Sequence, residues 1–220
     1  SGNNLALAFT GALTPVSARL EAQAALTAIA FLNLFAGGMV GTGWDIGLFN
    51  GMGLNADGTG IPESASLRGV VAHGWVGGTL QFDLAALLPG DGHHVVLLAS
   101  PKLRWAAFSG AGRGEAWMWE ADAAENFNGL QLHGTFFAGY QPPLALNTVG
   151  LLMETVQNLG YVRDLSPMRA SGWGSDFVQI TLSPLLSFTL SERSSLSVLV
   201  QLRRERLYSE PGIFAAYFAN

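Results

Sequence analysis

The segment covering residues 177–204 constrains the fold most, because apolar and polar side chains alternate along it in two long runs. A short polar stretch at residues 191–194 separates the runs. A period of two predicts a β-hairpin with one apolar face and one polar face. Strands of about ten residues with this alternation are typical of transmembrane β-barrels. The apolar positions of the hairpin are Val178, Ile180, Leu182, Leu186, Phe188, Leu190, Leu196, Val198, Val200 and Leu202.

The composition supports a bilayer location. Only 12% of the 220 residues are charged, the mean hydropathy is +0.30, and Lys102 is the single lysine. The alternative is a soluble β-sandwich with an unusually apolar core. A net charge of −5 without a basic cluster argues against a nucleic-acid partner, because phosphate binding needs grouped Lys and Arg. The chain has no cysteine, which excludes disulfides and thiolate metal sites.

One uncharged stretch, residues 24–41, is long enough to compete as a membrane-spanning helix. It contains Asn33 and the pair at residues 37–38, and it continues an upstream alternation in which Arg19 and Glu21 share a parity. A strand places these polar residues on one face, whereas a helix would scatter them. We therefore expect strands here.

The rest of the chain predicts an antiparallel meander of about ten strands in one domain, residues 1–220, with eight or twelve strands as alternatives. Residues 114–123 are either a strand extension or an extra hairpin. No signal-peptide pattern opens the sequence, so we expect a mature chain. The expected strand spans are 3–13, 16–36, 39–54, 66–87, 93–109, 128–141, 143–160, 174–190, 195–208 and 212–220.

The expected connections alternate in length. Those at 37–38, 88–92, 141–143 and 191–194 are short. The others, at 55–65, 110–127, 161–173 and 209–211, are longer or more irregular, except for 14–15. Outer-membrane barrels have short periplasmic turns and longer extracellular loops. The pattern and an even strand number predict that both termini are periplasmic.

These features together resemble bacterial outer-membrane β-barrel proteins as a class, without selecting one family. The final residues 213–220 are similar to the C-terminal assembly signal of that class, although the last aromatic residue, Phe218, lies two positions before the end. The resemblance implies an all-β, antiparallel, up-and-down transmembrane barrel in the bacterial outer membrane, with outer-membrane lipid as its surroundings.

Assigning the polar parity to the barrel interior places its charged residues in the outer half of the lumen. This expected cluster is Arg19, Glu21, His73, Lys102, Arg104, Glu154, Arg203 and Glu205. The cluster is either a charged constriction for a ligand or a salt-bridge plug, because charges in a narrow apolar interior must be paired. Trp75 and Phe137 share the inward parity and are expected to provide apolar contact area.

A catalytic role is disfavoured. His73 and His133 share the inward parity and Asp45, Asp83 or Glu154 could orient one of them, but no hydrolase motif is present. No cofactor and no metal site are expected, and the pair at residues 93–94 is interpreted as a solvated turn.

The sequence therefore predicts a narrow channel or binding barrel for a small hydrophobic or amphipathic solute. The alternative is a plugged structural barrel whose outer loops contact a surface or envelope protein. A membrane-embedded hydrolase is the weaker third hypothesis.

Overall fold

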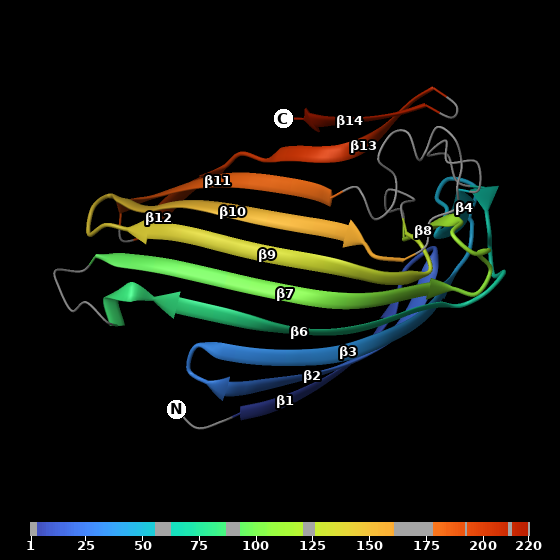
Figure 1. Cartoon of the computed structure of the whole chain (residues 1–220), viewed down its shortest axis with the longest axis horizontal. Coiled ribbons are helices and arrows are strands. Elements are labelled where there is room, and N and C mark those ends of the chain that lie inside the picture. Colours follow the sequence, from blue (N-terminus) through green and yellow to red (C-terminus); the bar gives the residue numbers. More distant parts are fainter. Residues whose placement is uncertain are drawn as a thin grey trace.

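The computed structural model describes residues 4–55, 63–86, 93–120, 126–160, 178–191, 193–210 and 213–219. Within these ranges no helix has the length and apolar character needed to cross a membrane. Eleven strands form one antiparallel sheet (Figure 1). They are β1 (Asn4–Leu13), β2 (Ser17–Ile29), β3 (Leu32–Gly43), β6 (Val71–Asp83), β7 (His94–Phe108), β9 (Gly129–Gln141), β10 (Leu146–Asn158), β11 (Val178–Ser191), β12 (Ser194–Leu199), β13 (Leu202–Glu210) and β14 (Ile213–Ala219). A short 3-10 helix, η1 (Leu84–Ala86), follows β6.

The sheet is an up-and-down meander. Its ten-strand path runs β1-β2-β3-β6-β7-β9-β10-β11-β13-β14, and β12 pairs with β11 beside that path. The expectation of an antiparallel up-and-down sheet of about ten strands is confirmed. Figure 1 shows β1 and β14 at opposite edges of the sheet. Among the described residues no pairing joins these two strands, so closure into a barrel is not observed.

The turn between β2 and β3 lies at residues 30–31, and the turn expected at 37–38 is wrong. Gly37 and Gly38 lie inside β3, where Gly37 pairs with Gln23 on one side and with Trp75 on the other. A Cβ atom at Gly37 would lie 2.6 Å from Cζ2 of Trp75. The glycine is therefore there to make room for an aromatic ring of the next strand, not to turn the chain.

The strand expected over residues 195–208 is interrupted at residues 200–201, between β12 and β13. Both parts keep one register against β11, because Leu199 pairs with Leu185 and Leu202 with Leu182. The position between them faces Pro184, whose carbonyl accepts from the amide of Val200 at 3.2 Å. Proline has no amide to return that bond, which explains the gap in the ladder.

The two faces of the long sheet differ completely in charge. From β1 to β12, the register places every charged residue and every histidine of the long sheet on one face, which we call the polar face. These residues are Arg19, Glu21, His73, Asp83, His94, Lys102, Arg104, His133 and Glu154. The opposite, apolar face is highly exposed, with Phe9 at 81% and Val76 at 56%.

A second, three-stranded sheet lies at one end of the long strands, at the right of Figure 1. It consists of β4 (Met52–Asn55), β5 (Glu63–Ser64) and β8 (Ala116–Trp119), in the order β5-β4-β8. The spans expected at 39–54 and 66–87 were too long, because β3 ends at Gly43 and β6 begins at Val71. Residues 116–119 form neither an extension nor a hairpin of the long sheet. We call this small sheet the cap.

The cap packs on the polar face, and an apolar core of buried residues lies between the cap and this face. The core comprises Met39, Met52, Ala65, Val71, Ala106, Phe108, Trp117 and Trp119. Four of these residues come from β3, β6 and β7, and the others come from the cap or its adjoining loop. The cap therefore covers the polar face where β3, β6 and β7 meet the long connections.

Candidate functional site

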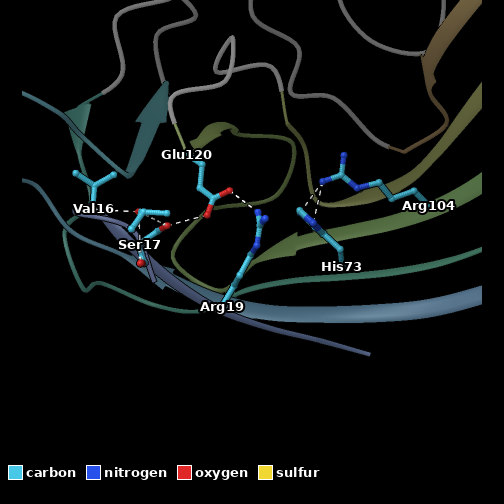
Figure 2. A network of polar contacts seen from close by, with 7 residues as sticks. Val16, Ser17, Arg19, His73, Arg104 and Glu120 are labelled. Atoms are coloured by element: carbon cyan, nitrogen blue, oxygen red, sulfur yellow. Dashed lines mark hydrogen bonds and ion pairs between the residues drawn. The ribbon is translucent and has the colours of Figure 1, made fainter. Parts of the chain in front are cut away.

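A network of hydrogen-bonded polar side chains crosses four neighbouring strands, β6, β7, β9 and β10, beneath the cap. Nη2 of Arg104 on β7 lies 2.9 Å and 2.8 Å from the two ring nitrogens of His73 on β6 (Figure 2). Nη1 of Arg104 donates to Oε1 of Gln131 on β9 at 3.3 Å. Nε2 of Gln131 donates to Oδ1 of Asn158 on β10 at 2.9 Å, and Nε2 of His133 lies 3.2 Å from Oε1 of Gln131. The network fixes the direction in which Arg104 extends.

Trp117 of the cap closes this network from above. Its ring stacks on His73 with centroids 6.1 Å apart and meets Phe108 edge-on at 5.9 Å. The indole is completely buried, and its Nε1 has no hydrogen-bond partner among the described residues. Phe108 is fully buried as well. The cap thus excludes water from one side of His73.

A polar contact ties the cap to β2. The carboxylate of Glu120, which follows β8, accepts from Oγ of Ser17 at 2.7 Å and from Nη1 of Arg19 at 2.6 Å. Figure 2 shows the carboxylate between these two donors. The backbone of Glu120 has a φ of +51°, and its amide donates to the carbonyl of Gly51. We call Ser17, Arg19 and Glu120 the latch.

A cavity of about 490 Å³ lies on the polar face beside this network. Its size falls in the range of small-molecule binding sites. We call it the polar-face cavity. Its lining residues are Glu21, Gln23, Phe35, His73, Trp75, Ser100, Lys102, Arg104, His133, Gly134, Thr135, Glu154, Thr155 and Val156.

The centre of the cavity wall is cationic. Lys102 and Arg104 are two residues apart on β7, so both face the cavity, about 7 Å apart along the strand. Glu21 and Glu154 line the same cavity from β2 and β10. In the described part of the chain, the ion pairs within 4.0 Å are Arg19–Glu120 and His94–Asp83, so neither carboxylate is in contact with Lys102.

Two aromatic rings form the apolar wall of the cavity. Trp75 on β6 pairs with Gly37 on β3, and Phe35 on β3 pairs with Gly77 on β6. A Cβ atom at Gly77 would lie 2.6 Å from Cζ of Phe35, the same distance as that between Gly37 and Trp75. Each ring therefore occupies the space over the glycine of the neighbouring strand.

The residues expected to cluster in a lumen divide into two groups. Glu21, His73, Trp75, Lys102, Arg104 and Glu154 line the polar-face cavity. Arg19 lies in the latch instead, with a carboxylate of the cap rather than with Glu21. Nη2 of Arg203 lies 3.5 Å from Oε1 of Gln201, and the arginine is exposed. The side chain of Glu205 lies outside the described residues.

Phe137 lies elsewhere on the polar face. It pairs with Leu98 and Leu152, and its ring covers Gly150, where a Cβ atom would lie 2.6 Å away. It does not line the polar-face cavity.

Of the long connections expected at 110–127 and 161–173, the first contains β8. The second lies outside the described residues.

Several contributors were missed by the sequence reasoning. Phe35 would have been assigned inward if the turn had been placed at 30–31, because it then pairs with Ala25. Gln131 has the same parity as His133 and could have been included on that basis. Glu120 and Trp117 carry no such signal, because their position depends on the pairing of β8 with β4.

In the described part of the chain, the turn histidines contact Asp83 and Tyr140. Nδ1 of His94 lies 2.6 Å from Oδ2 of Asp83, and His93 stacks on Tyr140 with centroids 5.8 Å apart. In the ranges that the structure describes, no three His, Asp or Glu side chains are grouped closely enough to hold a metal ion. Comparisons with protein-family models, curated proteins and solved structures find no match for the chain.

Proposed function

We propose that the chain is an integral outer-membrane β-barrel that binds or passes a small amphipathic solute through the space bounded by its polar face. The observation that carries this proposal is the separation of the two faces of the long sheet. A soluble monomer rarely exposes a continuous apolar patch of more than a few hundred Å². Here the exposed face of β1 to β12 carries no charge, and a bilayer is the environment that accommodates it.

The height of the apolar face fits a bilayer. Trp105 and Tyr140 are both exposed on this face, and Tyr140 pairs with Val95, ten residues from Trp105 along β7. At about 3.4 Å per residue this separation is about 34 Å along the strand. A tilt of about 35–45° reduces it to about 24–28 Å, close to the roughly 25 Å apolar band of outer-membrane barrels. The two rings are therefore placed like interfacial aromatic residues.

One strand departs from this separation. Arg204 on β13 pairs with Ile180, on the parity of the apolar face, and its Nη1 donates to the carbonyl of Val178 at 3.3 Å. Long arginine side chains near the end of a spanning segment can extend toward the interface. Since Val178 begins β11 at its long-connection end, the contact directs Arg204 toward the interface.

The proposal requires that the two edge strands meet in the membrane, because an open edge in lipid leaves backbone groups unsatisfied. The chain lacks cysteine, so single cysteines can be placed at Ala6, Ala8 or Thr10 in β1 and at Ala215, Tyr217 or Ala219 in β14. In liposomes we expect at least one pair to form a disulfide on oxidation, since paired strands bring Cα atoms within about 7 Å. Failure of every pair would overturn closure between these two strands.

The cap favours a second candidate function. Its packed core and its latch cover one end of the polar face, as expected for a plugged barrel that acts through its outer loops. Conductance in planar bilayers and solute uptake in a liposome-swelling assay separate the two functions. A solute route predicts measurable uptake, while a plugged barrel with a normal fold predicts none.

A further inference from the structure

We infer that the polar-face cavity binds a neutral sugar, with Phe35 and Trp75 contacting the apolar face of the sugar ring and polar side chains of the cavity wall contacting its hydroxyl groups. This inference rests on the proposed function and names the class of solute. A sugar is amphipathic in the required sense, because its ring carries C–H groups on its faces and hydroxyl groups around its edge. The cavity volume of about 490 Å³ is within the range of sites for ligands of this size.

The first observation is the balance of charge on the cavity wall. The carboxylates of Glu21 and Glu154 line the cavity together with the cations of Lys102 and Arg104. With the histidines counted as neutral, the formal charges of these described residues cancel. A site for an ion is expected to carry an excess of the opposite charge. A wall with both signs suits a ligand without net charge whose groups both donate and accept hydrogen bonds, as hydroxyls do.

The second observation is unused hydrogen-bonding capacity. Within the described part of the chain, Glu21, Lys102 and Glu154 make no hydrogen bond and no ion pair. Polar groups of folded proteins are normally bonded to other protein groups or to water. These three side chains come from β2, β7 and β10 and line one cavity. They therefore offer a bound ligand two acceptors and one donor from three different strands.

The third observation is a row of hydrogen-bonding side chains at one level of the sheet. Ser100 on β7 pairs with Thr135 on β9, which pairs in turn with Glu154 on β10. On the other side, Oγ of Ser100 lies 2.8 Å from Oγ1 of Thr79 on β6. Neighbouring strands are about 4.8 Å apart, so hydroxyls and a carboxylate follow one another at regular intervals. A site built from such groups favours a ligand with hydroxyls, because an analogue without them leaves the polar groups unpaired.

The fourth observation is the pair of aromatic rings beside this row. The ring of Phe35 lies over Gly77 of the neighbouring strand β6. Trp75 lies over Gly37 of β3 in the same way, and both rings line the cavity. Gly77 pairs on its other side with Lys102, so the apolar part of the wall adjoins the polar part. Rings on one side and hydrogen-bonding groups on the other match the C–H face and the hydroxyl edge of a sugar.

The test uses the full chain reconstituted into nanodiscs of zwitterionic lipid, with its fold checked by heat-modifiable electrophoretic mobility. Saturation-transfer difference NMR, corrected with empty nanodiscs, measures the binding of maltose, lactose and cellobiose as neutral probes. We expect saturable binding of at least one of them, with an affinity that changes less than about twofold with salt, since an uncharged ligand has no ionic attraction to screen. Glucuronate and glucosamine carry the glucose ring with a negative and a positive charge. They should displace the bound disaccharide no better than glucose does.

Two phenylalanines of the polar face provide a matched pair of variants. Each ring lies over a glycine of a neighbouring strand, but Phe35 lines the cavity and Phe137 does not. Phe35→Ala should weaken sugar binding by about tenfold through the loss of its ring contact, while Phe137→Ala should leave binding unchanged. Glu154→Ala should also weaken binding by about tenfold, the effect of losing one hydrogen bond to a charged group.

Three results would overturn the inference while the proposed membrane function stands. The first is an inserted chain that binds none of the three disaccharides. The second is an equal effect of the two phenylalanine variants, or unchanged binding in both Phe35→Ala and Glu154→Ala. The third is displacement by glucuronate or glucosamine at least about tenfold better than by glucose, which would indicate a site for an ion. Failure of the wild-type chain to enter the nanodiscs would overturn both the inference and the proposed function.

Discussion

The two ends of the polar face are built in different ways. At the end of the long connections, the cap buries Met52, Phe108, Trp117 and Phe127 almost completely. Toward the short turns the same face carries hydroxyl and amide side chains, such as Thr79 and Ser100, whose hydroxyls are 2.8 Å apart, and an exposed Gln81. Most apolar residues of the long strands lie on the opposite face, where they are exposed. The packed core of the described residues therefore lies at one end of the polar face, between the cap and the long sheet.

The largest effect should come from emptying the centre of that core. Trp117→Ala is expected to cost about 3–5 kcal/mol, the usual range for deleting a buried tryptophan side chain. The cost should appear as local opening of the cap, because the ladders of the long sheet do not depend on Trp117. Hydrogen exchange should accelerate in β4 and β8 and remain slow in β9 and β10.

Trp105→Ala is the matched control, since Trp105 lies on the apolar face and is 47% exposed. It should leave the exchange of the cap unchanged. If Trp117→Ala instead accelerated exchange throughout the long sheet, the cap and the sheet would be one cooperative unit and the contrast between the two ends would disappear.

The next effect tests the exposed face with two adjacent leucines of β10. Leu151 lies on the apolar face at 45% exposure, and Leu152 lies on the polar face, paired with Ser183. Leu151→Arg should destabilise the bilayer-inserted protein by about 2–4 kcal/mol if this position is near the bilayer midplane. Leu152→Arg should cost less, because the polar face offers water and carboxylates.

Urea titration in liposomes, followed by electrophoretic mobility, measures both variants. Equal stabilities for the two would refute the assignment of the faces to lipid and interior.

A smaller effect tests the fit of rings over glycines. Gly37→Ala places a Cβ atom 2.6 Å from Trp75 and 2.7 Å from the carbonyl oxygen of Ala22, so a ring and a backbone must both move. We expect a loss of about 1–3 kcal/mol, as for overpacking in a well-packed core. Gly74→Ala is the control, because nothing lies within 4 Å of its added Cβ atom. Thermal unfolding should separate the two variants, and indistinguishable midpoints would contradict the close approach.

The smallest effect belongs to the latch. Arg19 and Glu120 are 37% and 24% exposed, so solvent screens much of their attraction. A double-mutant cycle with Arg19→Gln and Glu120→Gln should give a coupling of about 0.5–1 kcal/mol in the stability of the cap. A coupling near zero would show that the core, and not the latch, holds the cap in place.

The sequence was sufficient for the long strands and for their faces, because the period of two persists from Val178 to Leu190 and along most other strands. It failed where a residue has a role set by a neighbour far along the chain. Gly37 looked like a turn residue because nothing local indicates that Trp75 will lie beside it.

The cap was beyond prediction for a related reason. β4, β5 and β8 contain four, two and four residues, too few to establish a period, and β8 reaches β4 only across a long separation in sequence. For the cavity, parity predicted which face Lys102, Arg104 and Trp75 would share. It did not predict that Arg19 would form an ion pair with Glu120 instead of lining the cavity.

The pairing of Trp75 with Gly37 and of Phe35 with Gly77 also bears on how the sheet finds its alignment. The connection between β3 and β6 covers residues 44–70, so it is too long to fix the register of these strands as a tight turn would. A slip of two residues in one direction sets Trp75 opposite Phe35, ring against ring. A slip in the other direction sets Gly37 opposite Gly77 and leaves a void, so only one alignment interlocks. The two ring–glycine pairs therefore favour one register of β3 against β6, without help from the loop that joins the two strands.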